Sequence, residues 1–338
     1  MNEIQLTKSV VFTGPKTAQY KDAPTKPMEP DSVLVRMEYS VISGGTERAN
    51  IMAMPNTPCN FPLYPGYCGV GIVSQIGPQV TNVTVGDRVV VYHGRHAQYC
   101  VVPERHVTKI TQPAPDSLEA AFTVIASMGL GGVRKLELEL GESAMVMGLG
   151  LLGIFAVQFL RLSGACPLIA ADLNPARREL ALRLGADYAF DPTDPDFVEK
   201  VKRVTDGKGV RATVEVTGVA AALQQALACA SYMGRISLLG CTRVSDCAVD
   251  YYRQVHCPGV KLIGAHNSVR PKVESYPHHW THQDDCKAIL DLLAAGRITA
   301  KPVLSRVVSP RDCTEIYNQL CDDPQFPMGT VFDWRDVK

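Results

Sequence analysis

Three glycines, Gly148, Gly150 and Gly153, stand in the pattern Gly-x-Gly-x-x-Gly, and Asp172 follows them. The first glycine of this pattern permits a tight turn, the second lets the backbone approach a pyrophosphate, and the third lets a helix pack close to its strand. The pyrophosphate then lies at the helix N-terminus, where free N–H groups and the helix dipole favour an anion. The pattern therefore predicts a dinucleotide site.

Asp172 indicates which dinucleotide binds. It follows Gly153 at close to the spacing of about 20 residues that is typical of an acid binding the ribose hydroxyls. A carboxylate at this position repels a 2′-phosphate, which favours NAD(H) over NADP(H). Arg177 and Arg178 could reach such a phosphate, although solvated charges on a helix face explain them as well.

The surrounding sequence supplies the elements that must hold this site. Residues 143–147 form a short apolar strand candidate before the glycines, and residues 154–160 read as a buried helix after them. Further strands are expected at 168–171, 212–216, 235–239 and 260–263, separated by amphipathic helices such as 175–184. This alternation predicts βαβ units with a parallel sheet.

The chain before residue 117 has a different character. Short β segments at 33–37, 70–73, 88–92 and 98–102 are separated by Gly and Pro, which predicts a compact all-β unit. After residue 263 come a polar, histidine-rich segment, a helix at 284–295 and a last strand at 330–332.

Composition excludes several function classes. Of 338 residues, 46% are apolar, and 34 basic side chains balance 34 acidic ones, so no global charge points to nucleic acid or an anionic membrane. Residues 1–5 resemble no targeting segment, and no apolar run could span a membrane. Eleven cysteines without a C-x-x-C pair indicate reduced thiols. We expect a cytoplasmic protein with a small-molecule substrate.

Six landmarks in this order resemble the medium-chain dehydrogenase/reductase superfamily: Ser43–Arg48 (SGGTER), Pro65–Gly71 (PGYCGVG), Val85–Val89 (VGDRV), the glycine pattern, Glu215–Gly218 (EVTG) and Gly234–Gly240 (GRISLLG). The resemblance covers essentially the whole chain. It implies a GroES-like β domain (1–117 and 264–338) and a doubly wound Rossmann domain (118–263). It also implies a homodimer paired through the edge run 260–263. The expected cofactor contacts are Gly148, Gly150, Leu151, Leu152, Gly153, Asp172, Leu173, Arg177, Thr217 and Gly240.

The chain departs from the family at its zinc ligands. Zinc-dependent members carry Cys-Gly-Thr/Ser-Asp, Gly-His-Glu and a third ligand near the domain junction, whereas this chain has Gly44, Tyr67, Cys68 and the junction 123–126 (TVIA) there. Catalytic zinc needs three protein ligands, which these residues do not supply. The four-cysteine lobe of structural zinc is also missing. We expect a member without metal, similar to the bacteriochlorophyllide hydroxyethyl dehydrogenases and to sugar or polyol dehydrogenases.

Candidates for proton handling lie where the zinc ligands of relatives converge. Tyr67 is the first choice, because its phenol can hydrogen-bond a carbonyl oxygen and, if its pKa is lowered, can accept the proton of an alcohol. Alternatively, Tyr67 is a wall of the substrate pocket. Ser43 is a further candidate, and the resemblance gives the Thr46 hydroxyl a relay role. Glu47 is either a base or a partner of Arg48 or Arg88.

Several other side chains are candidates for lining a substrate pocket: Cys68, His93, His96, His279 and Trp280. Imidazole titrates near neutral pH, and Trp280 could stack on a polyhydroxylated substrate. The clusters His93/His96/Cys100 and His278/His279/His282 contain zinc-type donors, but we favour surface or cleft histidines over a metal site.

These observations favour an NAD(H)-dependent, zinc-independent enzyme that interconverts a secondary alcohol, such as a sugar, cyclitol or polyol, and its ketone. An NADPH-dependent enoyl or quinone reductase is the alternative, although Asp172 disfavours it. A catalytically inactive dinucleotide-binding protein is the third possibility.

Overall fold

The computed structural model describes residues 6–58 and 60–337. Residues 1–5, on which the expectation of no targeting segment rests, and Cys59 lie outside them. The chain divides into two compact units, one of residues 1–125 and 283–338 and the other of residues 126–282. Both junctions lie later in the chain than the expected ones after 117 and 263, so that His279 and Trp280 belong to the second unit.

The second unit is built on a parallel sheet. Its strands are β8 (Ala144–Met147), β9 (Leu168–Ala171), β10 (Tyr188–Phe190), β11 (Val210–Glu215), β12 (Ala230–Leu238) and β13 (Lys261–Gly264). They lie in the order β10-β9-β8-β11-β12-β13, and every neighbouring pair is parallel. In chain order this is 3-2-1-4-5-6, the doubly wound arrangement that binds dinucleotides.

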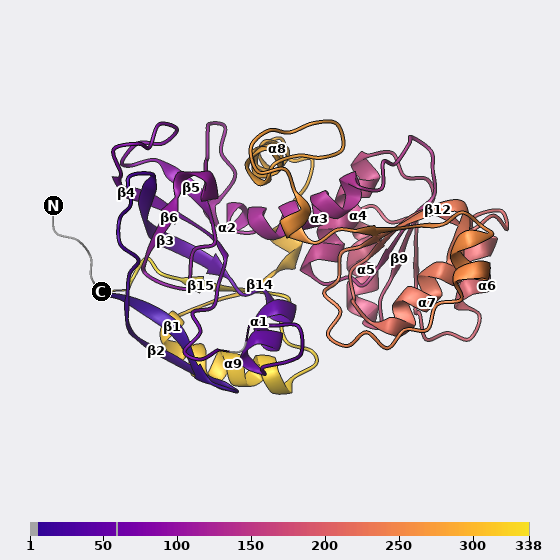
Figure 1. The fold of residues 1–338 in the computed structure, drawn as a ribbon, viewed down its shortest axis with the longest axis horizontal. Helices are drawn as coiled ribbons and strands as arrows, with labels where there is room; N and C mark the ends of the chain where they lie inside the picture. The colour runs from indigo at the N-terminus through magenta and orange to yellow at the C-terminus, as the bar shows by residue number, and fades with distance from the viewer. Residues whose placement is uncertain (1–5, 59, 338) are drawn as a thin grey trace. The chain divides into compact units, whose positions relative to one another are not determined.

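Helices flank this sheet on both faces (Figure 1). They are α4 (Leu151–Leu162), α5 (Pro175–Arg183), α6 (Phe197–Arg203) and α7 (Ala220–Cys229), with a π-helical turn at Tyr251–His256. Helices α3 (Thr123–Arg134) and α8 (His282–Ala294) span the two junctions. The four residues of β8 and of β9 are all buried, as in strands covered on both faces. Pro175 and the Asn174 cap start α5, and Gly185, with φ +116°, follows its end.

The first unit is mostly β structure. Its strands are β1 (Leu6–Gly14), β2 (Thr17–Pro24), β3 (Ser32–Val41), β4 (Cys68–Ile76), β5 (Arg88–Tyr92), β6 (Tyr99–Pro103), β7 (Val107–Lys109), β14 (Leu304–Val308) and β15 (Gly329–Asp333). Strands β1 and β2 form a hairpin. The others form a sheet ordered β14-β15-β3-β4-β5-β7, and β6 also pairs with β3. The helices are α1 (Gly44–Ile51), α2 (Ser117–Ala120) and α9 (Cys313–Asp322).

The end of the chain completes this first unit. Strand β15 pairs antiparallel with β3, and α9 packs beside β1 and β2 (Figure 1). Tyr317, Phe332 and Trp334 from this segment are buried in one core with Phe12, Val35 and residues of β4 and β5. The predicted fold class, a GroES-like β domain with a Rossmann domain, is confirmed. No helix among the described residues is long and apolar enough to cross a membrane.

Candidate functional site

The glycine loop follows β8 and leads into α4. Gly148 has φ +96°, and a Cβ there would lie 2.8 Å from the Thr217 Cγ2 atom. At Gly153 a Cβ would lie 1.9 Å from the Gly148 carbonyl oxygen, so only glycine lets the helix approach its strand. Gly150 caps α4 without a side chain, and a Cβ there would meet nothing within 4 Å. The loop therefore offers open space beside a helix N-terminus, as a pyrophosphate requires.

Residues from the loops after β11 and β12 lie beside the glycine loop. This is where the strand order reverses, because β8 lies between β9 and β11. Val216 donates its N–H to the Met147 carbonyl oxygen (2.9 Å). The Glu215 carboxylate accepts the N–H groups of Thr217 (2.7 Å) and Gly218 (3.1 Å) and the Thr217 hydroxyl. A Cβ on Gly240 would lie 2.3 Å from the Gly218 nitrogen. Gly148, Thr217 and Gly240 thus lie beyond the carboxyl ends of the parallel strands β8, β11 and β12. All three were expected to contact the cofactor.

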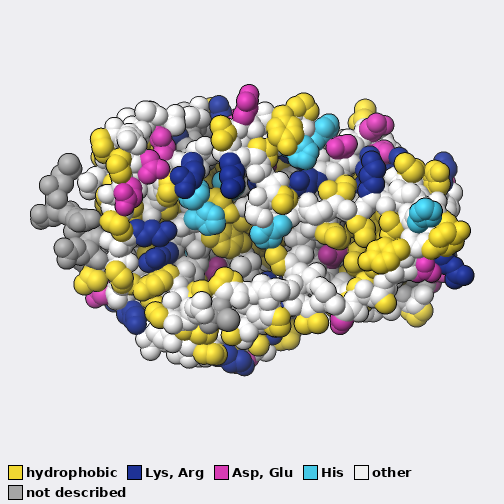
Figure 2. Space-filling model, viewed as in Figure 1, with side chains coloured by type: hydrophobic (Ala, Val, Ile, Leu, Met, Phe, Trp, Pro, Cys, Tyr) yellow, Lys and Arg dark blue, Asp and Glu magenta, His cyan; other side chains and the backbone are white. Residues whose placement is uncertain are grey.

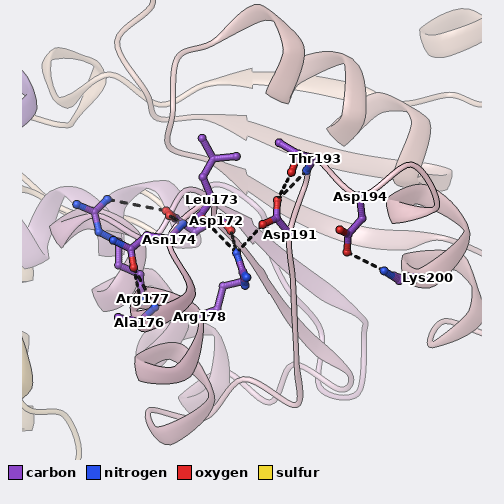
Figure 3. A network of polar contacts seen from close by, with 10 residues as sticks. All are labelled: Asp172, Leu173, Asn174, Ala176, Arg177, Arg178, Asp191, Thr193, Asp194 and Lys200. Atoms are coloured by element: carbon purple, nitrogen blue, oxygen red, sulfur yellow. Dashed lines mark hydrogen bonds and ion pairs between the residues drawn. The ribbon is translucent and has the colours of Figure 1, made fainter. Parts of the chain in front are cut away.

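Asp172 stands directly after β9 (Figure 3). Its Oδ2 accepts the N–H of Leu149 in the glycine loop (2.7 Å), and its Oδ1 accepts the N–H of Asn174 (2.8 Å). The side chain is 11% exposed. An ionised carboxylate can accept about four hydrogen bonds, so these two backbone donors leave half of its capacity for a ligand.

The two arginines that follow Asp172 have different partners (Figure 3). Arg178 donates from Nη1 to the carbonyl oxygens of Asp172 (2.7 Å) and Leu173 (3.0 Å) and pairs with Asp191 (3.0 Å). Arg177 Nη1 lies 4.0 Å from Asp172 Oδ2. Arg178 is therefore a structural residue, whereas Arg177 stands beside the predicted ribose site. Leu151 and Leu152 begin α4, and Leu173 is exposed.

The first unit holds a second carboxylate, Glu47 in the first turn of α1, which is 1% exposed. His96 Nε2 lies 3.2 Å from Oε1 and 3.1 Å from Oε2, the Tyr317 hydroxyl donates to Oε2, and the Ser43 N–H donates to Oε1 (2.8 Å). Three donors thus occupy most of the hydrogen-bonding capacity of this buried carboxylate.

The hydrogen-bond chain continues behind His96. Ser40 Oγ lies 2.7 Å from His96 Nδ1 and accepts the indole N–H of Trp334 (2.8 Å). Because Nε2 faces a carboxylate, that nitrogen carries a proton, and Nδ1 of a neutral ring then accepts the Ser40 hydroxyl proton. His96 is 0% exposed, so the prediction that it lines a substrate pocket is wrong.

The expected pairing of Glu47 with Arg48 or Arg88 is wrong. The guanidinium of Arg88 pairs with Glu38 (3.0 Å), and Arg48 Nη2 donates to the Cys321 carbonyl oxygen (3.2 Å). Sequence reasoning also missed the partners Ser40, Tyr317 and Trp334. No local signal marks them, because Tyr317 and Trp334 lie far along the chain.

Three of the four candidates for proton handling meet at the hydroxyl of Tyr67, just before β4. This hydroxyl donates to Ser43 Oγ (2.6 Å), and it also forms a side-chain hydrogen bond with Thr46. Burial raises the pKa of Tyr67 well above its ordinary value, and the nearby Cys68 and Glu47 add to this. The hydrogen bonds to Ser43 and Thr46 lower the pKa by less. The phenol thus keeps its proton at neutral pH and does not meet the condition for acting as a base.

The remaining pocket candidates are dispersed. Cys68 is 3% exposed, burial raises the pKa of its thiol, and Sγ donates to the Val41 carbonyl oxygen (3.3 Å). His93 is exposed and stacks on Tyr92. In the second unit, the Arg134 guanidinium lies 3.7 Å from the centre of the Trp280 ring, and His279 contacts Tyr276. Of these, only His93 lies at the surface near Tyr67, to whose carbonyl oxygen its N–H donates (2.9 Å).

The two histidine clusters do not form a metal centre among the described residues. Within 6–58 and 60–337, no group of three or more His, Cys, Asp or Glu side chains is placed to hold a metal ion. His96 is bound to Glu47 and Ser40, while the Cys100 thiol contacts the backbone of Arg95.

Two family models match the chain. The alcohol dehydrogenase GroES-like domain matches residues 29–112, and the zinc-binding dehydrogenase domain matches residues 152–294. The chain belongs to the medium-chain dehydrogenase/reductase superfamily. This membership makes the protein an oxidoreductase of the alcohol-dehydrogenase type that uses a nicotinamide dinucleotide.

Individual members of the superfamily are similar over most of the chain. D-guloside 3-dehydrogenase of Escherichia coli K12 is 25% identical and covers 96% of this chain and 100% of its own length. L-threonine 3-dehydrogenase of Pyrococcus horikoshii is 31% identical over 53% of this chain and 59% of its own. The solved alcohol dehydrogenase TADH from Thermus sp. ATN1 has a TM-score of 0.82 and 21% identity, covering 96% and 99% of the two chains.

Proposed function

We propose that the protein interconverts a secondary alcohol and its ketone with NAD(H), without a catalytic zinc ion. The substrate is a sugar, cyclitol or similar polyol. The observation that carries this proposal is the Asp172 carboxylate, which is oriented by two backbone N–H groups and retains free acceptor capacity beside the open glycine loop.

Electrostatics favours NAD(H) at this site. The Asp172 carboxylate accepts hydrogen bonds from ribose hydroxyls and repels a 2′-phosphate. Arg178 is held by Asp191 and two carbonyl oxygens, which directs its charge away from the ribose. Arg177 favours NADP(H) instead, because its guanidinium lies 4.0 Å from the carboxylate and could pair with a 2′-phosphate.

The donor set supports a reaction without zinc. Gly44, Tyr67 and Cys68 occupy positions where zinc-dependent members have ligands or their neighbours. The Cys68 Sγ donates to the Val41 carbonyl oxygen, and no group of three His, Cys, Asp or Glu side chains among the described residues is placed to hold a metal ion. Glu47 and His96 bind each other in the core.

Tyr67 provides an alternative means of polarising the substrate oxygen. A bound nicotinamide would supply the hydride chemistry, accepting a hydride from the carbinol carbon in alcohol oxidation and donating one in ketone reduction. The Tyr67 phenol, held by Ser43 and Thr46, is a hydrogen-bond donor of fixed orientation. In ketone reduction the phenol would turn its single proton from Ser43 Oγ to the substrate and so stabilise the negative charge that develops on the carbonyl oxygen. Glu47 acts as a positioning residue, because it holds the N–H of Ser43.

A polyol substrate is supported by the full-length similarity to a guloside dehydrogenase. We further propose a homodimer that pairs through β13, the edge strand of the parallel sheet. Leu262 and Ile263 on this strand are half-buried in the single chain, and pairing would satisfy its free backbone groups.

A cofactor-reduction screen tests the proposal. After chelation and removal of metal, the enzyme is assayed with NAD and with NADP against secondary alcohols, polyols and sugars. We expect turnover of secondary alcohols with NAD. Loss of activity on chelation that zinc restores would contradict the metal-free reaction. A preference for NADPH with enones or quinones would identify a reductase of C=C bonds, and NAD binding without any turnover would identify an inactive protein.

A further inference from the structure

A pocket of ≈ 550 Å³ lies within the first unit and has no role in the proposed reaction so far. Its size is within the range of small-molecule sites, about 300–1,000 Å³. It is lined by side chains or backbone of Lys26, Pro62, Leu63, Tyr64, Gly66, His93, Arg95, Val102, Pro103, Arg105 and His106.

The lining is positively charged. Lys26, Arg95 and Arg105 contribute three permanent positive charges, and no Asp or Glu is among the lining residues. Arg105 forms a long ion pair with Asp31, with Nη1 and Oδ2 3.6 Å apart. Figure 2 shows Lys, Arg and His side chains gathered near one another on one face of the molecule.

The guanidinium of Arg95 is oriented, although no carboxylate of the described chain pairs with it. It lies 4.1 Å from the centre of the Tyr64 ring, and its Nη1 donates to the Pro24 carbonyl oxygen (3.3 Å). An aromatic ring and a carbonyl oxygen fix the side chain while leaving its full positive charge uncompensated. Lys26, whose side chain is exposed, forms no ion pair with the described residues either. Such a pair of cations fits a doubly charged anion better than a neutral ligand.

The positive charges of this lining also affect the pKa values of two histidines in the pocket. The rings of His93 and His106 lie 4.8 Å apart. Partial desolvation of the exposed His93 ring lowers its pKa, and Lys26 lowers it further. The pKa of His106 is lowered to about 4, mainly by burial and then by His93, Arg105 and Lys26. The Nδ1 atom of His106 is buried without a hydrogen-bond partner among the described residues. The pocket therefore disfavours further positive charge.

The pocket adjoins the peptide that carries the candidate catalytic phenol. Gly66 lines it and immediately precedes Tyr67, while His93 donates its N–H to the Tyr67 carbonyl oxygen. Gly66 has φ +94°, and a Cβ there would lie 2.6 Å from the His96 nitrogen, so this wall is fixed by close backbone packing. A ligand group held in the pocket thus lies next to the backbone of the Gly66–Tyr67 peptide.

We propose that this pocket binds the anionic group, a phosphate ester or a carboxylate, of the alcohol on which the enzyme acts. The cationic lining supplies affinity for the anion, and the adjacent Gly66–Tyr67 peptide connects it to the reacting end of the substrate. The proposal rests on the proposed function and narrows its substrate class to acidic or phosphorylated polyols.

The first experiment needs no turnover. Inorganic phosphate is titrated into the protein by calorimetry and by NMR of the histidine side chains. We expect saturable binding that shifts the signals of His93 and His106. The double variant Lys26→Gln/Arg95→Gln should bind phosphate at least about tenfold more weakly, because each charge-assisted contact is worth more than an ordinary hydrogen bond.

A matched control is Lys21→Gln/Arg311→Gln. It removes the same charge from the same unit, and Arg311 also lies over an aromatic ring, that of Tyr20, but neither residue lines the pocket. This control should bind phosphate like the wild type. Absence of phosphate binding, or equal weakening in both double variants, would overturn the proposed site.

The second experiment distinguishes the anionic end of a substrate from a separate anion. Sorbitol 6-phosphate and gluconate are compared with sorbitol under NAD reduction. We expect the charged substrates to have the lower KM in the wild type, and their KM to rise at least about tenfold in Lys26→Gln/Arg95→Gln while the kinetics with sorbitol stay unchanged. If phosphate binds but the KM of charged substrates does not respond, the assignment to substrate is wrong.

The two proposals fail in distinguishable ways. Turnover of neutral polyols without phosphate binding would overturn the anion pocket and leave the dehydrogenase function standing. Phosphate binding without turnover of any alcohol would instead overturn the proposed function, and with it the assignment of the pocket to a substrate.

Discussion

The two units each contain a carboxylate held by backbone N–H groups, yet the carboxylates are suited to different tasks. Glu47 is buried and accepts hydrogen bonds from His96, Tyr317 and the Ser43 N–H, so most of its acceptor capacity is used within the protein. Asp172 receives only two backbone N–H groups and retains an exposed edge. A carboxylate saturated by its own protein stabilises the fold, whereas a half-saturated one is preorganised to bind a ligand.

The substitution Glu47→Gln tests the structural half of this comparison and should have the largest effect. Removing the charge breaks a buried network and leaves donors of His96, Tyr317 and Ser43 without a full acceptor. We expect the free energy of unfolding to fall by about 3–5 kcal/mol. Urea unfolding followed by tryptophan fluorescence measures it, since Trp334 belongs to the same network.

Asp22→Asn is the matched control for Glu47→Gln. Asp22 pairs with Lys8 at the surface of the same unit (2.9 Å), so its loss should cost about 1 kcal/mol or less. If Glu47→Gln left stability unchanged and abolished turnover, Glu47 would be a catalytic base rather than a positioning residue.

Tyr67→Phe tests whether the Tyr67 hydroxyl contributes to catalysis, while leaving the buried hydrogen bonds of Glu47 in place. The phenyl ring keeps the packing but removes the hydroxyl that donates to Ser43. We expect kcat to fall by about 10²–10³-fold, as for the loss of one donor to a developing oxyanion, with little change in NAD affinity. Steady-state kinetics and NADH fluorescence titration measure the two quantities. Unchanged kcat would make Tyr67 a pocket wall.

Asp172→Asn tests the ligand-binding half of the comparison. The amide loses the charge that accepts ribose hydroxyls, so we expect NAD binding to weaken by about 1.5–3 kcal/mol. Stability should also fall, by about 1–3 kcal/mol, because Asn has a single acceptor oxygen for the N–H groups of Leu149 and Asn174. The preference for NAD over NADP should shrink, because Arg177 then stands beside a neutral side chain. Titration of both cofactors checks this.

Two variants control the interpretation of Asp172→Asn. Asp194→Asn removes a nearby acid that pairs with Lys200 (2.7 Å) and should leave both affinities unchanged. Adding Arg177→Ala to Asp172→Asn should reverse any gain in NADP affinity. A wild-type enzyme that already prefers NADP would show that Arg177, not Asp172, determines the cofactor.

The smallest expected effect concerns pH and the cationic pocket. Because the pKa of His106 is lowered to about 4 in the folded protein and is about 6.5 when unfolded, the unfolded chain binds this proton first as pH falls. Stability is therefore lost between about pH 6.5 and 4. Partial exposure keeps the effect below about 1 kcal/mol. The loss between pH 7.5 and 5 should be smaller in His106→Gln than in the wild type, and an equal loss would exclude His106 as its source.

The same contrast explains which features could be predicted from sequence. The dinucleotide site is encoded locally, since Gly148–Gly153 and Asp172 lie on consecutive βα elements whose pattern fixes their geometry. Strand β10 was missed because three residues carry too little periodicity. The Glu47 network was missed because His96 reaches it from the loop before β6 and Tyr317 reaches it from α9, and such contacts exist only after the chain has folded.

The late position of Tyr317 and Trp334 has a consequence for synthesis of the protein. The second unit is complete once residue 282 has left the ribosome, whereas the first unit still lacks α9 and β15 at that stage. Until they arrive, Glu47 lacks its Tyr317 donor and Ser40 its Trp334 donor. The first unit therefore completes its core only after the last part of the chain has been synthesised. A nascent protein that stops short of this segment exposes an incomplete core to proteases and chaperones.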